Sequence, residues 1–508
     1  MNKNSVISSV RAPLVGLTAM SLLLWGCSKP ASREAKSDVA AAPGPADART
    51  HSADLTDETL PPILKMAWKG DLDQMVKRRV VRVLVPFRRP DFFYMEGRPV
   101  GILQEAFQEF EKILNAKYKT TASNRVIVVL IPTPPDKLRD RMLAGYGDIA
   151  AYGISITPEN KAAVDFTIPT ITGLSIVVVT GPGAPELKTV EDLSGKDVWI
   201  TPGTRMRKDL EDLNTKLKAQ GKKPVVARDA DPVLNPGDVM EMVNAGTYPI
   251  TLMQNKTAEF WAQVFPNAKP RIDLTVAQDV EFGWAIQKGT PQLKADLDDF
   301  LKTRAAGSSF GNTLIRRYLH DVKYVKNAQD PAELRRFEKV APLFRKHAGQ
   351  YNFDYLLLIA QGYQESGLDQ KVKSPVGAVG IMQVMPTTAA AAPVKIPDIS
   401  SEDNNIHAGI RLMHFLVNDY FNEPALDQMN RTLLAIAAYN AGPAKITKCR
   451  RVAEEMGYDR NKWFDNVEVA TAKLVGGETT QYVANIYKYY VAYRLAAAQL
   501  LSGKVKKS

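Results

Sequence analysis

The sequence predicts a multidomain protein in which an α/β part is followed by an all-helical part. Its 508 residues are more than one hydrophobic core of ordinary size organises. Strand-like and helix-like segments alternate between about residues 71 and 318, which favours an α/β architecture with a largely parallel sheet. After about residue 326 the apolar side chains recur at helical spacing only. The composition, 45% hydrophobic and 24% charged, is that of a soluble globular protein and excludes wholesale disorder and a polytopic membrane protein.

The N-terminus has the pattern of a secretory signal. Lys3 and Arg11 precede an apolar stretch at 14–25 that ends just before Cys27. Spanning a bilayer takes about 20 residues, so the stretch is short for that purpose; an uncleaved anchor helix is the alternative. The pattern resembles bacterial lipoprotein signals, which implies cleavage after residue 26 and a lipid such as palmitate on Cys27. Ser28 resembles the sorting signal for the outer membrane, so we expect a lipid-anchored protein on the periplasmic face of a Gram-negative outer membrane.

The cysteine count and the net charge narrow the class of protein further. If Cys27 carries lipid, Cys449 is the only thiol left, so no internal disulfide is expected and Cys449 is most simply inert. The net charge of +11 is compatible with nucleic acid as a partner, but export argues against that interpretation. The basic residues are dispersed, so they either form a solvated surface or favour anionic wall polymers and lipid headgroups.

The segment 27–55 is rich in Ala, Pro, Ser and Asp and is expected to be a flexible linker. In the α/β part, β-branched apolar runs predict strands, and the spacing of Leu103, Phe107 and Phe110 predicts a helix. The expected strands are 80–85, 126–131, 175–180 and 197–201, and the expected helices are 101–114 and 135–144.

Five short motifs give the α/β part a family resemblance. They lie at residues 82–85, 101–105, 147–150, 156–159 and 164–169. In this order and spacing they resemble the periplasmic solute-binding domain of the amino-acid type, solute-binding-protein family 3. The resemblance implies a non-catalytic domain at 56–325 with two α/β lobes, a ligand cleft between them, and closure about a hinge.

The residues that bind amino acids in that family do not carry over. An arginine usually holds the ligand carboxylate at the position of Asn160, and an aspartate that takes the ligand ammonium aligns with Gln254. Unpaired charges of a zwitterion in a cleft cost on the order of several kcal/mol, so a free amino acid is a poor ligand. A muropeptide or peptide is the expected ligand, unless the domain is a spacer. Arg205 and Arg207 either supply substitute positive charge or are surface arginines.

The helical part contains one glutamate in a position suited to acid catalysis. Apolar spacing from Phe353 onward predicts a helix that Gly367 stops, which places Glu365 at its C-terminal end. The helix dipole and partial burial both raise the pKa of a carboxylate there, as a general acid requires. A solvated surface glutamate is the alternative. The expected helices are 334–348, 353–365, 406–420, 432–441 and 479–501.

Four motifs distinguish between these readings of Glu365. They lie at residues 365–367, 374–386, 438–442 and 478–483, and are similar in order and spacing to those of the soluble lytic transglycosylase family, whose fold is goose-lysozyme-like. The resemblance covers about residues 335 to 495 and implies an all-α catalytic domain at 326–508. The whole arrangement resembles the membrane-bound lytic murein transglycosylase F group.

The resemblance implies roles for the matched residues. Glu365 corresponds to the family's catalytic acid/base, and Tyr482 to the aromatic residue that faces it; simple helix packing is the alternative for Tyr482, and core packing for Met382 and Met385. The implied substrate-binding residues are Ser374, Gly380, Met382, Gln383, Tyr439, Asn440 and Tyr482.

A single catalytic carboxylate indicates the reaction type. Retaining glycoside hydrolysis uses two carboxylates about 5 Å apart, whereas the motifs supply one, because Asp369 lies beyond Gly367 and is expected to face solvent. In the transglycosylase family one glutamate protonates the glycosidic oxygen between MurNAc and GlcNAc, then takes the C6 hydroxyl proton as a 1,6-anhydro ring closes. We expect peptidoglycan as substrate and no metal or cofactor, since no His/Cys cluster has metal spacing. The alternatives are a hydrolytic muramidase, a ligand-sensing receptor with a wall-binding helical domain, and a scaffold.

Overall fold

The computed structural model describes residues 66–95, 97–319 and 331–501. The expected signal and linker, with Cys27, lie outside the described residues. The described residues belong to one compact unit. Within the described ranges, every helix is too short or too polar to cross a membrane.

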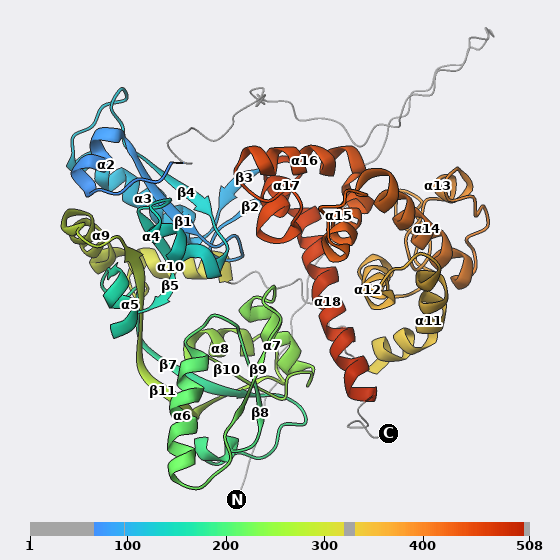
Figure 1. The fold of residues 1–508 in the computed structure, drawn as a ribbon, viewed down its shortest axis with the longest axis horizontal. Coiled ribbons are helices and arrows are strands. Elements are labelled where there is room, and N and C mark those ends of the chain that lie inside the picture. Colours follow the sequence, from blue (N-terminus) through green and yellow to red (C-terminus); the bar gives the residue numbers. More distant parts are fainter. Residues whose placement is uncertain (1–65, 96, 320–330, 502–508) are drawn as a thin grey trace, which may run out of the picture. The chain divides into compact units, whose positions relative to one another are not determined.

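The α/β part is built on one mixed sheet with the strand order β4-β1-β5-β11-β7-β10-β8-β9, and β6 pairs with β11 (Figure 1). We call the part on β4, β1, β5 and β6 lobe 1, and the part on β10, β8 and β9 lobe 2. A separate hairpin comprises β2 (Phe93–Met95) and β3 (Arg98–Val100). The sheet strands are β1 (Val80–Val85), β4 (Ile127–Pro132), β5 (Ile149–Ser155), β6 (Asp165–Phe166), β7 (Ile171–Thr180), β8 (Asp197–Ile200), β9 (Val226–Asp229), β10 (Ile250–Gln254) and β11 (Lys269–Ile286).

The sheet is parallel only at its two ends. β1 runs parallel to β4 and β5, and β8 runs parallel to β9 and β10. In the centre, β11 is antiparallel to both β5 and β7, and β10 is antiparallel to β7. The expectation of a largely parallel sheet is therefore wrong for the centre. The reason is β11, whose charged first half hides the apolar pattern of a strand.

Helices cover the sheet and form a core for each lobe. In α3, Leu103, Phe107, Phe110 and Leu114 are buried beside β1, which confirms the helix predicted from their spacing. A separate apolar cluster lies in lobe 2, around β8 and α6. The helices are α2 (Leu72–Arg78), α3 (Ile102–Lys117), α4 (Leu138–Leu143), α5 (Pro158–Ala163), α6 (Met206–Ala219), α7 (Pro236–Asn244), α8 (Asn255–Ala262), α9 (Pro291–Arg304) and α10 (Ser309–Leu319).

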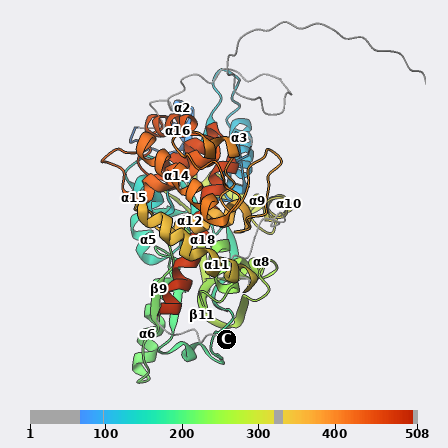
Figure 2. The same ribbon diagram turned by 90° about the vertical axis from the view of Figure 1, so that its right-hand side faces the viewer.

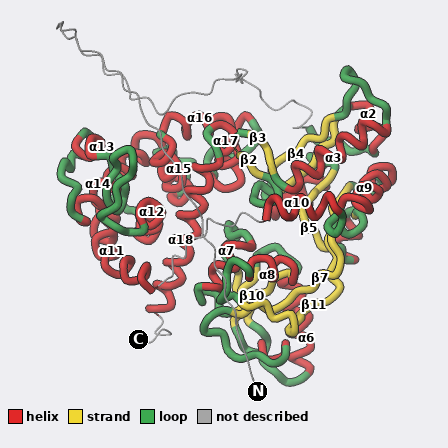
Figure 3. Tube along the Cα trace, turned by 180° about the vertical axis from the view of Figure 1, so that it is seen from behind, coloured by secondary structure: helices red, strands yellow, loops and turns green. Residues whose placement is uncertain are grey.

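From residue 331 onward the described chain is helical, and Figure 3 shows that the strands belong to the preceding part. The five helices expected here are present as α11, α12, α14, α15 and α18. The short α13 and α17 and the charged α16 were not expected. The bounds are α11 (Pro331–Gln350), α12 (Tyr355–Ser366), α13 (Pro386–Ala390), α14 (Glu402–Tyr420), α15 (Gln428–Ala441), α16 (Pro443–Glu455), α17 (Glu468–Leu474) and α18 (Gly477–Leu501).

Helix α12 is the buried helix of this part. Asp354 caps its N-terminus by accepting a hydrogen bond from the Leu356 N–H, and Gly367 ends it in the left-handed region at φ 65°. Its residues from 356 to 363 are all buried. Helices α11 and α18 lie beside it in both views (Figures 1 and 2). The core therefore fixes the position of the last turn, where Glu365 lies.

Helix α18 contacts two regions. It packs against α12, where Tyr489 and Tyr493 contact Tyr363, and its Lys488 is buried against α7 of lobe 2. The Lys488 ammonium lies 2.9 Å from Glu241 Oε2 and 3.9 Å from Asp238 Oδ1. Tyr487 donates a hydrogen bond to Asp231 at 3.2 Å. One helix thus contacts both α12 and lobe 2.

Candidate active site

Glu365 lies in the last turn of α12 and is half-buried. Its Oε1 accepts a hydrogen bond of 2.5 Å from the Tyr482 hydroxyl. Burial raises the pKa of Glu365 to about 7, and the hydrogen bond from Tyr482 opposes that shift. The raised pKa expected from the sequence is present, with burial as its main cause. Burial thus moves the titration of this carboxyl group toward neutral pH.

Two tyrosines from other helices converge on Glu365. Tyr482 on α18 is 7% exposed, and burial followed by the nearby Glu365 carboxylate raises the pKa of its hydroxyl. Tyr439 on α15 also has a raised pKa, through burial and then the same carboxylate. The Tyr439 hydroxyl donates a 2.7 Å hydrogen bond to the Met382 carbonyl oxygen. The structure thus brings Glu365, Tyr439 and Tyr482 together from three helices.

The loop that contains the second motif is held by its own hydrogen bonds. Ser374 Oγ accepts from the Ala378 N–H at 2.9 Å, and Gln383 Nε2 donates to the carbonyls of Val372 and Gly380 at 3.1 and 2.8 Å. No hydrogen bond joins Ser374 or Gln383 to Glu365 among the described residues. In this structure both side chains shape the loop rather than contact the carboxylate.

Gly380 and Met382 act through the backbone. Gly380 has φ 78°, and a Cβ there would lie 2.4 Å from the Asn405 amide nitrogen, so the position requires glycine. Met382 is fully buried and packs on Gly409, so its side chain is core, as the alternative proposed. Its N–H donates to Asn405 Oδ1 at 2.8 Å. Asn440 is exposed at the end of α15, and its Oδ1 accepts from the Thr479 hydroxyl at 2.7 Å.

Two residues near the site were missed in the sequence. Asn405 on α14 holds the loop through Met382 N–H and the Val379 carbonyl. Gln361 lies one helical turn before Glu365, fully buried, and its amide reaches the Tyr482 hydroxyl. The sequence feature that could have identified Gln361 is a polar residue inside an apolar helical run. Among the described residues, no three His, Cys, Asp or Glu side chains are arranged to hold a metal ion.

In the α/β part, three of the four residues considered for ligand binding form side-chain contacts with neighbours. Asn160 Nδ2 donates to the Ser155 carbonyl at 2.9 Å, and Arg139 donates to Asn160 Oδ1 at 3.3 Å. Arg205 forms a bidentate pair with Asp209, and Arg207 pairs with Asp229. These pairs favour the interpretation of Arg205 and Arg207 as structural rather than ligand-binding. Gln254 lies at the N-terminus of α8.

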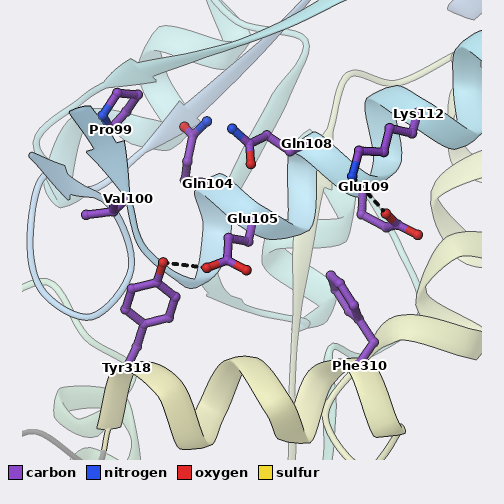
Figure 4. A pocket seen from close by; sticks show the side chains of 9 residues that line it. All are labelled: Pro99, Val100, Gln104, Glu105, Gln108, Glu109, Lys112, Phe310 and Tyr318. Carbon is purple, nitrogen blue, oxygen red and sulfur yellow. Dashed lines mark hydrogen bonds and ion pairs between the residues drawn. The ribbon is translucent and has the colours of Figure 1, made fainter. Parts of the chain in front are cut away.

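A pocket of about 260 Å³ lies on lobe 1 between α3, the β2–β3 hairpin and α10 (Figure 4). Its carboxylates already have partners. Glu105 accepts from the Tyr318 hydroxyl at 2.6 Å and pairs with Arg317, and Glu109 lies 3.7 Å from Lys112. The pocket therefore offers no unpaired charge to a ligand, and it is separate from Glu365.

Two family models match the chain. The model for bacterial extracellular solute-binding proteins, family 3, matches residues 81–319. The transglycosylase SLT domain matches residues 342–464. The α/β part is also similar to solved structures, including an ancestral arginine-binding protein bound to arginine, at 21% identity and TM-score 0.37, which covers 47% of this chain and 98% of that one. A binding component of an ABC transporter from Wolinella succinogenes complexed with lysine is 20% identical with TM-score 0.39, over 49% and 98%.

Curated relatives match the chain through both parts. A membrane-bound lytic murein transglycosylase F from Pseudomonas fluorescens is 26% identical over 82% of this chain and 85% of its own length. One from Ectopseudomonas mendocina, with the same name, is 27% identical over the same shares. The chain therefore has a family 3 solute-binding domain followed by a transglycosylase SLT domain, is similar over most of its length to membrane-bound lytic murein transglycosylases F, and is a lyase that acts on peptidoglycan.

Proposed function

We propose that the chain cleaves the β-1,4 bond between MurNAc and GlcNAc and leaves 1,6-anhydro-MurNAc ends, in remodelling and turnover of the cell wall. The observation that carries the proposal is Glu365, a half-buried residue at the end of α12 whose pKa is raised to about 7 by burial. Its hydrogen-bond partner is a tyrosine rather than a second carboxylate. Asp369 accepts from the Lys371 N–H at 2.9 Å, so it is engaged outside the site.

The proposed reaction uses Glu365 twice. In the first step protonated Glu365 gives its proton to the glycosidic oxygen, the bond from that oxygen to C1 of MurNAc breaks, and GlcNAc leaves. The carboxylate that remains is stabilised by the Tyr482 O–H. In the second step Glu365 takes the proton of the C6 hydroxyl, while O6 forms a bond to C1. Water is neither consumed nor released, and Glu365 ends protonated as it began.

The surrounding residues support binding of a glycan strand. The loop at 374–383, with Gly380, Met382 and Gln383, is fixed by hydrogen bonds to itself and to Asn405. Ser374, Tyr439, Asn440 and Tyr482 complete the substrate-binding set that we propose. A loop fixed before binding loses less conformational freedom when substrate arrives.

Mass analysis of the products tests the proposal directly. Purified peptidoglycan is digested with a soluble form that starts after Cys27, and the muropeptides are separated and weighed. We expect anhydro-muropeptides, which are one water lighter than hydrolytic products. Products with reducing MurNAc ends instead would make the chain a hydrolytic muramidase, and intact peptidoglycan would favour the receptor or scaffold alternatives.

We also propose that residues 1–26 are a signal peptide, that 27–55 form a linker, and that lipid on Cys27 anchors the chain to the outer membrane from the periplasmic side. The support is the sequence pattern around Cys27 and the relatives' name, which describes them as membrane-bound. Cys27→Ser should then accumulate as an unprocessed precursor in the inner membrane. Recovery of that variant in the outer membrane would refute the anchor.

For the solute-binding domain at 56–325 we propose a peptide or muropeptide ligand, coupled to the catalytic domain at 326–508. The support is that Asn160 is hydrogen-bonded to the backbone of Ser155 where a receptor for free amino acids would place an arginine. Coupling requires unequal binding to two states, with an effect of about 5- to 150-fold. Calorimetry and activity of the soluble chain, with muropeptides and with amino acids, test this; tight amino-acid binding would contradict it.

A further inference from the structure

Gln361 is the one side-chain amide in the buried middle of α12. The residues from Leu356 to Tyr363 are all buried, and Gln361 is 0% exposed. It lies one helical turn before Glu365, so the two side chains occupy the same face of the helix. An apolar side chain of similar length would fill this position without burying polar atoms.

The amide of Gln361 is paired on one side only. Its Nε2 donates a long hydrogen bond, 3.5 Å, to the Tyr482 hydroxyl oxygen. The same hydroxyl donates to Glu365 Oε1 at 2.5 Å. Within the described residues, Gln361 Oε1 is buried with no hydrogen-bond partner. The Tyr482 hydroxyl therefore lies between the Glu365 carboxylate and an amide with an open acceptor.

The two protonation states of Glu365 place different demands on this hydroxyl. When Glu365 is ionised, the Tyr482 O–H stabilises the carboxylate, and the Gln361 N–H supports the tyrosine oxygen. When Glu365 is protonated, its own O–H is required at the glycosidic oxygen. Rotation of the amide by half a turn exchanges its N–H and C=O groups. The Tyr482 O–H can then be donated to Gln361 Oε1, which fills the open acceptor.

We propose that Gln361 is a positioning residue that keeps the Tyr482 hydroxyl within reach of both acceptors, so that the hydroxyl follows Glu365 through its acid and base steps. The proposal rests on the two-step use of Glu365 given above. It assigns Gln361 no contact with substrate. Its effect on the reaction passes through Tyr482 alone.

The pH dependence of the reaction reports on this arrangement. The titratable groups that face Tyr482 are Glu365 on α12 and Tyr439 on α15. Burial raises the pKa of Glu365 and the hydrogen bond from Tyr482 opposes that rise, with no cation among the described residues contributing. We expect the plot of kcat against pH to have a limb near pH 7, where Glu365 titrates. A shift of that limb in a Gln361 variant would therefore reflect a change in the pKa of Glu365.

Gln361→Met in the soluble chain tests the proposal, because methionine has a similar length and cannot take the place of the amide. We expect kcat to fall about 3- to 10-fold, the effect of one hydrogen bond, with KM unchanged. The limb near pH 7 should move upward by about 0.3 to 1 unit, because Tyr482 becomes a weaker donor to Glu365. Leu358→Met, a fully buried apolar position on the same helix, is the matched control and should change neither quantity.

Two further measurements separate this inference from the proposed function. In a Tyr482→Phe background, Gln361→Met should lower kcat no further; an additive loss overturns the inference. A 13C NMR titration of the Glu365 carboxyl group gives its pKa without turnover, and an unchanged titration together with unchanged kcat in Gln361→Met also overturns it. Failure of the wild-type chain to release anhydro product would instead refute the proposed function. The NMR titration requires no turnover, so its result is independent of that outcome.

Discussion

Two acidic sites in this molecule differ in the partner that each carboxylate has. Glu365 is paired with the neutral Tyr482 hydroxyl, and burial raises its pKa to about 7. Asp238 and Glu241 on α7 also have pKa values raised by burial, but Lys488 lies against both and lowers them. Burial lowers the pKa of Lys488, yet the two carboxylates more than offset this and raise it overall.

The difference shows how a fold assigns chemistry or structure to buried acids. With a neutral partner, Glu365 can both lose and regain its proton near neutral pH, as acid and base steps require. A buried cation instead keeps the carboxylates of α7 charged and makes them a structural contact. Both partners, Tyr482 and Lys488, lie on α18. The same helix therefore contacts the Glu365 carboxylate through Tyr482 and lobe 2 through Lys488.

The largest effect should come from removing the mobile proton. Glu365→Gln keeps the size of the side chain and can still accept from Tyr482, but it cannot donate a proton to the glycosidic oxygen. We expect release of anhydro-muropeptides to fall by about 10² to 10⁴-fold. Turnover is measured by muropeptide mass analysis, with circular dichroism as the control for folding. Wild-type turnover in this variant would remove Glu365 from the mechanism.

Removing the cation from the other site should affect stability instead. Lys488→Met leaves Asp238 and Glu241 buried with no cation, which should lower the free energy of unfolding by about 3 to 5 kcal/mol. Thermal unfolding of the soluble chain measures this. Adding Asp238→Asn and Glu241→Gln to that variant should restore much of the loss. Lys302→Met, which breaks an exposed pair with Asp299, is the matched control and should leave the melting temperature unchanged.

A smaller effect follows from the sign of the Glu365 shift. The pKa of Glu365 is raised on folding from 4.5 to about 7, so the carboxyl group ionises more readily in the unfolded chain. As pH rises from about 4.5 through 7, this difference lowers the free energy of unfolding. Glu365→Gln has no such penalty, so it should be more stable than wild type at pH 8 by about 1 to 2 kcal/mol. The two proteins should unfold alike at pH 4. Equal stability at both pH values would mean that Glu365 is solvated.

The sequence allowed the helical part to be predicted better than the sheet. Gly367 marked the end of α12 because glycine adopts the left-handed conformation at low cost. By contrast, β11 was missed because polar residues occupy much of a strand that bends past both lobes. Motif matching also placed Met382 in the substrate-binding set, although only its backbone faces the site. Which atom of a residue reaches a site depends on tertiary packing, which the sequence pattern does not specify.

The polar residues behind the site were the hardest to predict. Gln361 and Asn405 lie inside helices whose apolar spacing is their visible feature. Nothing local indicates that one reaches Tyr482 and the other the backbone of Met382. Such contacts join segments far apart in the chain, so they become visible only in the folded structure.

The smallest expected effect concerns Ser374, which the motif places near the reaction and the structure places within the loop. Its Oγ accepts from the Ala378 N–H at 2.9 Å, so Ser374→Ala removes a loop hydrogen bond, worth about 0.5 to 1.5 kcal/mol. If that is its only role, kcat should fall less than about tenfold and the limb near pH 7 should stay in place. A hydroxyl that contacts the Glu365 carboxylate would behave as Tyr482 does, because its loss would move that limb upward. Measuring kcat against pH for Ser374→Ala beside Tyr482→Phe therefore decides whether Ser374 is a neutral partner of Glu365. An upward shift of the limb in both variants would make Ser374 such a partner. A shift in Tyr482→Phe alone would leave Ser374 as a residue that shapes the loop.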